Sequence, residues 1–308
     1  MIAAVVVLFH PNRENIRTLV DRLSPQVSTI YLMDNTFPAD TDFEVFLSNI
    51  QSPSVRYKKL GKNGGIAWAQ NQGVTWAESE GHDHVVFFDQ DSLPDSKMIS
   101  YLQSAMDELV AKGRRVAAVG PTWLDIKTKR YASAIVTNPF KASRTPVTPE
   151  SKEFLKVDIL ISSGSLVAIE AFKKIGPINE DIFIDGADVE WSLRAKHLGF
   201  ESYLIPQAVL QHSMGDHVVK VGGRSLILHS PIRNYYNIRN TCYLLTQGHI
   251  DVFWKIKKIV TIVPYIILLS WFSEERCLNL RIMITAVCHG MRGRLGVAPG
   301  AVKDTLKT

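Results

Sequence analysis

The sequence predicts an α/β protein with a mostly parallel sheet, helices on both faces of that sheet, and a helical segment at the C-terminal end. Short runs of β-branched and other apolar residues alternate with segments whose apolar residues recur at helical spacing. The short runs are continuous, which is typical of strands buried on both faces. Residues 251–308 differ, because their apolar stretches are flanked by lysine and arginine.

The first half of the chain contains the clearest strand and helix patterns. We expect strands at residues 2–9, 28–33, 55–60 and 84–88, and helices at residues 13–23, 66–79 and 98–110. Parallel strands end at a common edge of the sheet, and ligands bind beyond that edge. Polar side chains follow these strands, namely His10, Asp34, Asn63, Asp89 and Asp91. The sequence therefore predicts a binding site at this edge.

The second half of the chain is less regular. We expect strands at residues 116–119, 157–161, 166–169 and 200–205, a short helix at residues 170–175, and another helix that begins near Ala187. Residues 125–153 are polar and contain three prolines. They form either a β-meander or a mobile loop that covers the site.

Composition narrows the class of protein. The chain has 308 residues and a net charge of +5, which suits an anionic membrane surface or phosphorylated substrates. No dense basic run interleaved with aromatic residues occurs, so we expect no nucleic-acid partner. The three cysteines lack CxxC spacing, which disfavours a disulfide framework or a zinc site and fits a reducing cytosol. The apolar N-terminal run has no basic flank, so it predicts a strand and no signal peptide.

Two carboxylates separated by one residue end the strand at residues 84–88. Residues i and i+2 of an extended chain point to the same side, so Asp89 and Asp91 can converge on one Mg²⁺ or Mn²⁺ that carries phosphate oxygens. The alternative is a strand that ends in an ordinary turn, since Asp and Ser favour turns. The triplet alone does not decide between them.

Residues 61–65 are rich in glycine and precede a predicted helix. Such a loop can offer backbone N–H groups to an anion or let a nucleotide approach closely. It matches neither the dinucleotide fingerprint nor the P-loop. A plain turn with a helix cap explains the loop equally well.

A second acidic cluster follows at residues 183–194. Asp188 is expected in the first turn of a helix, and either caps that helix or acts as a base that accepts a proton from an alcohol. Glu190 is expected to point elsewhere. Further on, His212 is a lone histidine, and we expect it to contact a metal ion or a diphosphate only if the fold brings it beside Asp91.

Residues 229–240 combine arginine with tyrosine, and Arg233, Tyr235, Tyr236 and Arg239 suit contact with a diphosphate or a sugar. An amphipathic helix with a solvated basic face is the alternative. Beyond it, residues 252–272 and 282–287 contain apolar stretches flanked by lysine, arginine and tryptophan. We favour helices that lie in a membrane interface over core helices because of these basic flanks. No stretch reaches the ~18 apolar residues of a confident membrane span.

The order of these motifs resembles that of inverting family 2 glycosyltransferases with the GT-A fold, over about residues 1–245. Within that family the chain is most similar to bacterial rhamnosyltransferases of O-antigen and capsule assembly. The stretches that carry the resemblance are 63–67 with Asn71, the DxD motif at 88–92, residues 161–165 and 183–194, and residues 229–231 with Arg233, Tyr235, Tyr236, Arg239 and Asn240. It implies a GT-A catalytic domain at residues 1–250, with a donor half at about 1–120 and an acceptor half at about 121–250. Residues 251–308 would form an amphipathic helical membrane-interface segment.

The resemblance also implies the substrates and the roles of the residues. The donor would be dTDP-β-L-rhamnose, and the acceptor an undecaprenyl-diphosphate-linked glycan at the cytoplasmic face of the cell membrane. Mg²⁺ or Mn²⁺ would be held by Asp91, Asp89 and His212, and Asp188 would be the general base. Donor contacts would come from Phe9, His10, Asp34, Asn63, Gly64, Gly65, Asp89 and Gln90. Acceptor or diphosphate contacts would come from Ser163, Gly164, Asp185, Trp191, Arg233, Tyr236 and Arg239.

One departure from the family pattern concerns the base. Family members often carry Glu-Asp where this chain has Ala187-Asp188, so the base is retained but a neighbouring acid is absent. Two other functions stay open: a transferase of the same fold that uses another nucleotide sugar, and a non-catalytic, membrane-attached glycan-binding protein. A nucleotide-binding oxidoreductase is disfavoured, because His10-Pro11 stands where a glycine fingerprint would follow the first strand.

Overall fold

The computed structural model describes residues 1–38, 41–48, 50, 52, 54–126, 129–132, 147–212, 217–221, 224–228, 230–271, 275–300 and 302. For residues 41, 212, 217–221 and 224–228 it describes the backbone alone. About half of the polar segment expected to be a meander or a covering loop, residues 133–146, therefore lies outside the described residues. His229, the first residue of one motif, lies outside them as well.

Four parallel strands form one half of the main sheet, in the order β3-β2-β1-β4. Their bounds are β1 Ile2–Leu8, β2 Thr29–Asp34, β3 Val55–Lys59 and β4 His84–Asp89. In register, Leu8 lies opposite Asp34, and Val7 lies opposite Asp89. The carboxyl ends of β1, β2 and β4 are therefore level, as a common binding edge requires.

The other half of the sheet continues from β4 through β8, β6 and β9 to β5. The long strands β6 and β9 are parallel to each other, whereas the short strands β5, β7 and β8 run antiparallel to their neighbours. The bounds are β5 Leu93–Pro94, β6 Val116–Asp125, β7 Leu155–Val157, β8 Leu166–Ala168 and β9 Glu201–His212.

Three strand predictions in this half need correction. The strand expected at 157–161 is the earlier and shorter β7, and residues 158–161 form a connection in which the Leu160 amide donates to Ser192 Oγ at 3.3 Å. Strand β6 extends to Asp125, well beyond the expected end at 119. Strand β9 runs through Pro206 to His212 as one element, with a register shift against β6 at this point.

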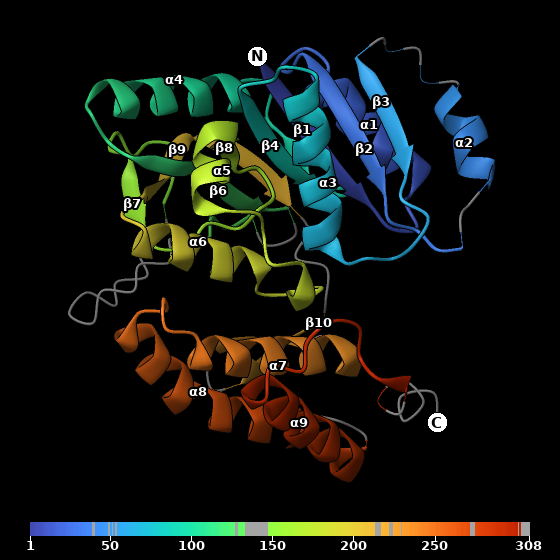
Figure 1. Cartoon of the computed structure of the whole chain (residues 1–308), viewed down its shortest axis with the longest axis vertical. Coiled ribbons are helices and arrows are strands. Elements are labelled where there is room, and N and C mark those ends of the chain that lie inside the picture. The colour runs from blue at the N-terminus through green and yellow to red at the C-terminus, as the bar shows by residue number, and fades with distance from the viewer. Residues whose placement is uncertain are drawn as a thin grey trace.

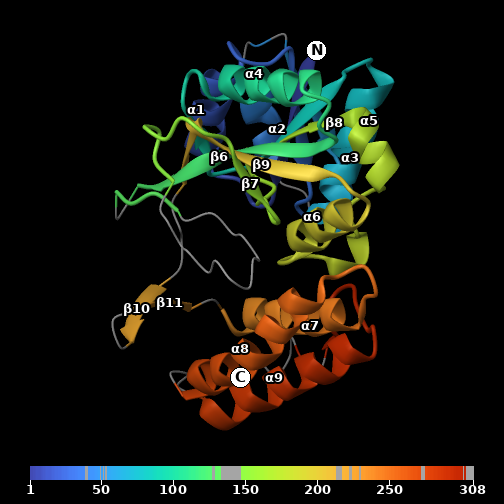
Figure 2. The ribbon, with the colours of Figure 1, turned by 90° about the vertical axis from the view of Figure 1, so that its left-hand side faces the viewer.

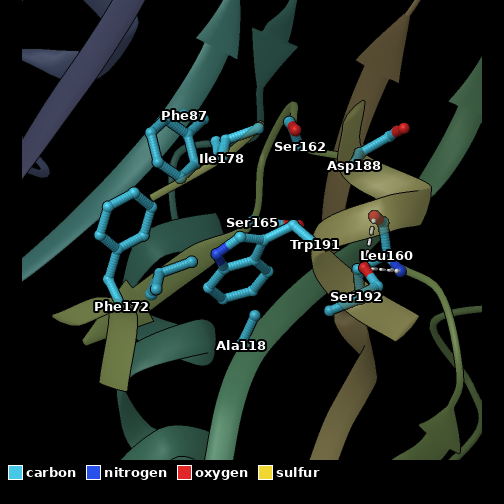
Figure 3. Close-up of a pocket in the computed structure, with 11 residues that line it drawn as sticks. Phe87, Ala118, Leu160, Ser162, Ser165, Phe172, Ile178, Asp188, Trp191 and Ser192 are labelled. Atoms are coloured by element: carbon cyan, nitrogen blue, oxygen red, sulfur yellow. Dashed lines mark hydrogen bonds between the residues drawn. The ribbon is translucent and has the colours of Figure 1, made fainter. Parts of the chain in front are cut away.

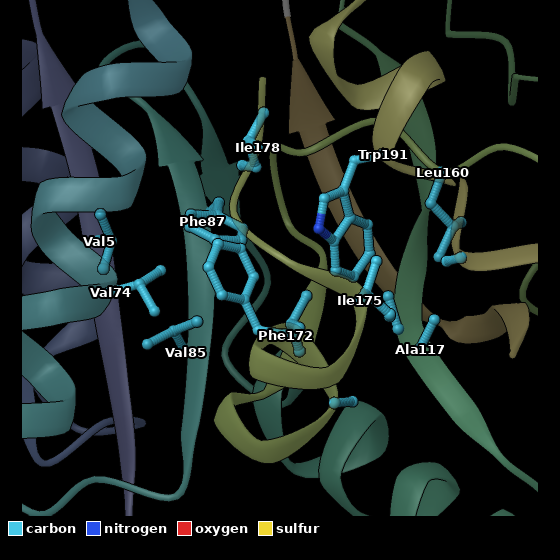
Figure 4. Packing of buried hydrophobic residues seen from close by; sticks show 14 of the residues in the cluster. Val5, Val74, Val85, Phe87, Ala117, Leu160, Phe172, Ile175, Ile178 and Trp191 are labelled. Carbon is cyan, nitrogen blue, oxygen red and sulfur yellow. The ribbon is translucent and has the colours of Figure 1, made fainter. Parts of the chain in front are cut away.

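Helices cover both faces of the sheet, as the sequence predicts (Figure 1). One face is covered by α1 Arg13–Leu23, α2 Thr41–Ser48 and α4 Met98–Ala111. The other is covered by α3 Ile66–Ser79, α5 Ile169–Ile175 and α6 Ala187–His197, with the 3-10 turn η1 Glu180–Ile182 before α6. Figure 4 shows the second of these cores, where Phe87 of β4 packs against Phe172 and Trp191. The α/β fold is thereby confirmed.

Three further helices form a layer below the α/β part, and α6 lies between this layer and the sheet (Figures 1 and 2). They are α7 Pro231–Thr246, α8 Val252–Trp271 and α9 Arg276–Met291; the hairpin β10 His217–Val221 with β11 Arg224–Leu228 lies to one side. Helix α9 approaches α7 so closely that a Cβ on Gly290 would overlap the Arg239 carbonyl oxygen. Helix α7 thus packs with α8 and α9, although we expected the domain division at residue 250; that division stays a prediction.

Helix α8 continues through Pro264. Its apolar residues are unevenly covered: Trp254 and Leu269 are buried, whereas Val260 and Val263 are mostly exposed. Within the part of the chain that the structure describes, no helix combines the length and the apolar character needed to cross a membrane.

Candidate active site

The strand-end residues of the parallel half are joined by hydrogen bonds. The Gln90 side chain receives a bond from the Phe9 amide at 2.8 Å and donates to the Phe9 carbonyl at 3.1 Å. Asn35 Nδ2 donates to Asn63 Oδ1 at 3.0 Å, and Asn35 Oδ1 accepts from the Gly64 amide at 2.9 Å. The ends of β1 and β4 are thus tied to each other, and the end of β2 is tied to the glycine-rich loop.

A cleft of about 670 Å³ opens at this edge. Its size falls in the range of pockets that hold a small-molecule ligand, roughly 300–1,000 Å³. On the donor side it is lined by Phe9, Asn63, Gly65, Asp89, Gln90 and Asp91. Ser162, Ser163, Asp185, Asp188, Arg233 and Tyr236 line the other side. Eleven of these twelve residues belong to the set predicted from the sequence or from the resemblance, and Ser162 is the exception.

Asp89 and Asp91 bring two carboxylates to the floor of the cleft. The Asp89 amide donates to Ser163 Oγ at 3.1 Å, and Ser163 Oγ lies 2.7 Å from Ser92 Oγ, so the turn after β4 is fixed from behind. Burial, together with the charges of Asp91 and Asp188, raises the pKa of Asp89 to about 7, although the charge of Arg233 acts in the opposite direction. Such an excess of negative charge is the environment that a bound cation relieves.

Asp89 and Asp91 alone are too few ligands to hold a cation without help from a substrate or water. Among the described residues, no group of three or more His, Cys, Asp or Glu side chains is placed to hold a metal ion. Mg²⁺ commonly takes one or two carboxylates and completes its shell with substrate phosphates and water. Asp89 and Asp91 fit that pattern. The backbone of His212 ends β9, but its side chain lies outside the described part of the chain, so its role as a third ligand stays a prediction.

Asp188 lies in the first turn of α6, beside Ser162 at the rim of the cleft (Figure 3). Burial raises the pKa of Asp188 to about 6, and the nearby charge of Asp185 acts in the same direction. The backbone amides of Val189 and Ser162 oppose this rise. Next to Asp188 lies a cavity of about 20 Å³, lined by Phe87, other apolar side chains and three serines, which has room for a water at most. A carboxylate with a pKa near 6 is ionised at neutral pH yet still basic enough to accept a proton.

The backbone before Asp188 is strained. Phe183 has φ 67°, Asp185 has φ 58° and Gly186 has φ 96°. Positive φ costs a residue with a side chain about 1–3 kcal/mol, so the surroundings must hold this conformation. Asn240 of α7 does so, because its Nδ2 donates to the carbonyls of Ile182, Ile184 and Asp185 at 3.1, 2.7 and 2.7 Å.

The same loop also contacts the donor side. The Ile66 amide, at the start of α3, donates to the Phe183 carbonyl at 2.9 Å. Gly65 has φ 89°, and a Cβ at this position would lie 2.5 Å from the Phe183 carbonyl oxygen. Only glycine therefore fits between the glycine-rich loop and the loop before Asp188.

Arg233 and Tyr236 complete the acceptor side of the cleft. Arg233 Nε lies 3.2 Å from Asp185 Oδ2, in an ion pair at the mouth of the cleft. Tyr236 stacks on Phe183 with 5.3 Å between ring centroids, and its hydroxyl accepts from the Ala298 amide at 2.8 Å. Both side chains thus reach the cleft from α7.

Two residues expected to contact the acceptor or the diphosphate do not line the cleft. The Trp191 indole is buried in the core, stacks on Phe172, and donates to the Gly176 carbonyl at 2.9 Å. Arg239 is fully buried and donates to the carbonyls of Gly296 and Ile182 at 2.6 and 3.0 Å. These residues stabilise α6 and the helical layer, which corrects the two predictions.

Four other predicted contacts lie next to the cleft instead of lining it. Asp34 is buried and accepts from the Tyr57 hydroxyl at 2.7 Å and from the Thr36 amide at 2.9 Å, so its carboxylate is used within the fold. The His10 amide donates to Thr36 Oγ1 at 2.9 Å. Gly164, at φ 83°, packs against Pro121, and Gly64 packs against Trp68.

The sequence did not reveal what Asn240 does, although it lies in a stretch that carried the resemblance. An asparagine in the middle of a helix is a weak signal of such a role, because its intrinsic helix propensity is low and another interaction must retain it. Its partners are more than fifty residues earlier in the chain, so helical spacing could not identify them.

Known proteins that are similar to this chain identify its family. Residues 4–176 match the family model described as glycosyl transferase family 2. The chain belongs to that family. The dTDP-rhamnosyl transferase RfbF of Shigella flexneri is 31% identical over 296 residues, which are 96% of this chain and 97% of that protein. This member of the family is therefore a glycosyltransferase.

Solved structures share the fold of this glycosyltransferase. GalNAc-T7 crystallised with UDP, GalNAc and Mn²⁺ has a TM-score of 0.56 and 13% identity, over 84% of this chain and 54% of that one. TarS of S. aureus has a TM-score of 0.55 and 12% identity, over 99% and 50%. The chain thus spans about half the length of both. The 1–349 form of TarS matches with a TM-score of 0.54 and 12% identity, over 96% and 82%. At these identities the likeness shows the GT-A-type fold alone.

Proposed function

We propose that this glycosyltransferase moves L-rhamnose from dTDP-β-L-rhamnose to a hydroxyl of a lipid-linked glycan in the synthesis of a cell-surface polysaccharide such as O-antigen or capsule. One structural observation carries the proposal: Asp188, with its raised pKa, lines the same cleft as the Asp89–Asp91 pair. A base and a site for charged phosphate thus share one pocket. The choice of rhamnose and dTDP rests on the likeness to RfbF.

Asp188 acts as the general base in this proposal. Its carboxylate accepts the proton of the acceptor hydroxyl while the hydroxyl oxygen bonds to the anomeric carbon of the donor. The bond from that carbon to the dTDP oxygen breaks at the same time, and its electron pair leaves with dTDP. One displacement inverts the anomeric centre, so the β-linked donor gives an α-L-rhamnoside. The desolvated position of Asp188 makes it a stronger base than an exposed aspartate.

Asp89 and Asp91 would hold Mg²⁺ or Mn²⁺ together with the diphosphate of the donor. When bound, the ion supplies Lewis-acid stabilisation of the charge that develops on the leaving diphosphate. The nucleoside would lie along Phe9, Asn63 and Gly65, which line the same side of the cleft. Arg233, already at the mouth of the cleft, is placed to contact a diphosphate once it exchanges Asp185 for that partner.

The proposed location is the cytoplasmic face of the cell membrane, where the enzyme would be peripheral. The support is the outer surface of α8, where large apolar side chains are exposed in a continuous stretch, namely Phe253, Ile256, Ile259, Val260, Val263, Ile267 and Trp271. An apolar helix face beside lysines is typical of binding in the membrane interface. A lipid-linked acceptor would be met at the same surface.

The test is transfer with purified protein, a lipid-linked acceptor and a panel of dTDP, UDP and GDP sugars. We expect turnover with dTDP-β-L-rhamnose, loss of turnover with EDTA, and recovery on addition of Mg²⁺ or Mn²⁺. Asp188→Asn should lower kcat by at least about a hundredfold, in the usual range of a general base. Asp181→Asn, a change at an exposed aspartate outside the cleft, is the matched control.

Each arm has an outcome that counts against the proposal. Preference for a UDP or GDP sugar would show a transferase of the same fold that uses another nucleotide sugar as its donor. Equal turnover of Asp188→Asn and Asp181→Asn would exclude Asp188 as the general base. Turnover undiminished by EDTA would exclude the proposed role of a metal ion. Binding of the glycan with no transfer from any donor would favour a glycan-binding protein.

A further inference from the structure

A second cavity, of about 220 Å³, lies between α7 and α8, away from the donor side of the main cleft. Helix α7 contributes Asn237 and Thr241 to its lining, and α8 contributes Lys258, Thr261 and Tyr265. Two isoleucines complete the described lining, and no carboxylate is among those residues. We call this cavity the α7–α8 groove. Its lining offers one cation and several neutral hydrogen-bond donors.

One face of α7 contributes residues to both the groove and the main cleft. On α7, residues Arg233, Asn237 and Thr241 are four apart, so they share one face of the helix, and Arg233 lines the main cleft. On α8, Lys258, Thr261 and Tyr265 are three and four apart and share the face toward α7. Burial raises the pKa of the Tyr265 hydroxyl, and the charge of Asp185 adds to this rise, so the Tyr265 end of the groove lies toward the loop before Asp188.

Charge in the groove is positive. Lys258 is half-buried, and burial lowers the pKa of its ammonium group, as does the charge of Lys257. Its ammonium lies 5.3 Å from the centre of the Trp254 ring. A desolvated ammonium without a carboxylate in the same lining attracts an anion more strongly than an exposed lysine does.

An apolar surface lies on the outer side of α8, opposite the face that lines the groove. Ile256, Val260, Val263 and Ile267 recur at spacings of four, three and four, and each is more than half exposed. The helix thus presents a polar, cationic face to the groove and an apolar face to the outside. A molecule that fits both faces carries an anionic group next to a long hydrocarbon chain.

We propose that the α7–α8 groove binds the diphosphate of a polyprenyl-diphosphate-linked acceptor, with the hydrocarbon chain along the exposed face of α8. The nature of this acceptor rests on the proposed function; the groove itself rests on Lys258, its polar neighbours and the apolar stripe. Lys258 precedes Tyr265 by seven residues, which is about 10 Å along a helix. This separation leaves room for a short saccharide between the diphosphate in the groove and the hydroxyl that reaches Asp188.

Binding without turnover tests the groove directly. Farnesyl diphosphate should bind the full-length protein, farnesol should bind much more weakly, and inorganic diphosphate should bind weakly because it lacks the chain. Lys258→Gln should weaken farnesyl diphosphate roughly tenfold, the effect of one charge-assisted contact. Lys257→Gln removes the same charge from the exposed side of α8 and should change binding less than twofold.

Kinetics supply the second readout. We expect Lys258→Gln to lower the preference for a diphosphate-linked acceptor over an alkyl glycoside of the same saccharide by roughly tenfold, through KM. Equal farnesyl diphosphate affinity of Lys258→Gln and Lys257→Gln would overturn the proposal. A further result would also overturn it, namely that both variants lose affinity for anionic vesicles and for farnesyl diphosphate to the same extent. The two lysines would then act only by attracting anionic lipids in general. A parent enzyme that uses another donor yet binds farnesyl diphosphate through Lys258 would refute the rhamnose proposal and support the groove.

Discussion

Replacing Asn240 by alanine should release the loop that precedes Asp188. The Asn240 carboxamide has two N–H groups and donates to three loop carbonyls, so about two hydrogen bonds are lost. At about 1 kcal/mol each, and with buried carbonyls left unpaired, we expect the free energy of unfolding to fall by about 2–3 kcal/mol. Phe183 and Asp185 would then leave their positive φ values, because nothing holds the strain.

Activity should fall further than stability explains. Displacing a catalytic group by about 1 Å can cost about a hundredfold in rate, so kcat of Asn240→Ala should drop at least tenfold under conditions where the variant is fully folded. Urea unfolding gives the stability, and steady-state transfer gives kcat. Asn279→Ala is the matched control, since its buried Nδ2 donates to the Leu269 carbonyl at 3.1 Å outside the cleft. Full kcat in Asn240→Ala, with stability lowered as in Asn279→Ala, would refute the reasoning.

Three further predictions concern Gly65 and Asp188. Gly65→Ala should lower the free energy of unfolding by about 1–2 kcal/mol more than Gly61→Ala, because both have positive φ but only Gly65 faces the Phe183 carbonyl; equal urea midpoints would contradict this. kcat/KM should fall tenfold per pH unit below about 6, where Asp188 becomes protonated, and a flat profile to pH 5 would exclude it as the base. The folded-state pKa of Asp188 lies above its ordinary value of 3.8, so its contribution to stability is present below that value and is lost as pH rises to about 6. Asp188→Asn should therefore have the higher Tm at pH 7.5 but not at pH 4, and an unchanged Tm at pH 7.5 would contradict the assigned burial.

The parallel half of the fold was predictable because its signals are local. Continuous apolar runs marked β1, β2 and β4, and a polar residue after each of these runs marked the edge where the cleft opens. Strand polarity then brought Asp89 and Asn63 to one side of the cleft without any knowledge of tertiary contacts. In this half, the polar residues that could bind a ligand also lie at the strand ends, so their residue type was sufficient to predict that they line the cleft.

The acceptor half was harder because its elements depend on partners far away in the sequence. Trp191 and Arg239 look like ligand contacts by residue type, yet their polar groups are used by backbone carbonyls inside the fold. Helical spacing could not distinguish a buried guanidinium from one at the cleft. Strand β7 is short because residues 158–161 turn toward α6, an interaction that no local pattern encodes.

The contact between Gly65 and Phe183 ties two regions of the chain that are more than a hundred residues apart. A longer loop at 183–186 would displace the start of α3, and a side chain at position 65 would displace the loop. A substitution or insertion in either region therefore requires a compensating change in the other. The side chains of α7 and α8 that line the groove take no part in this contact.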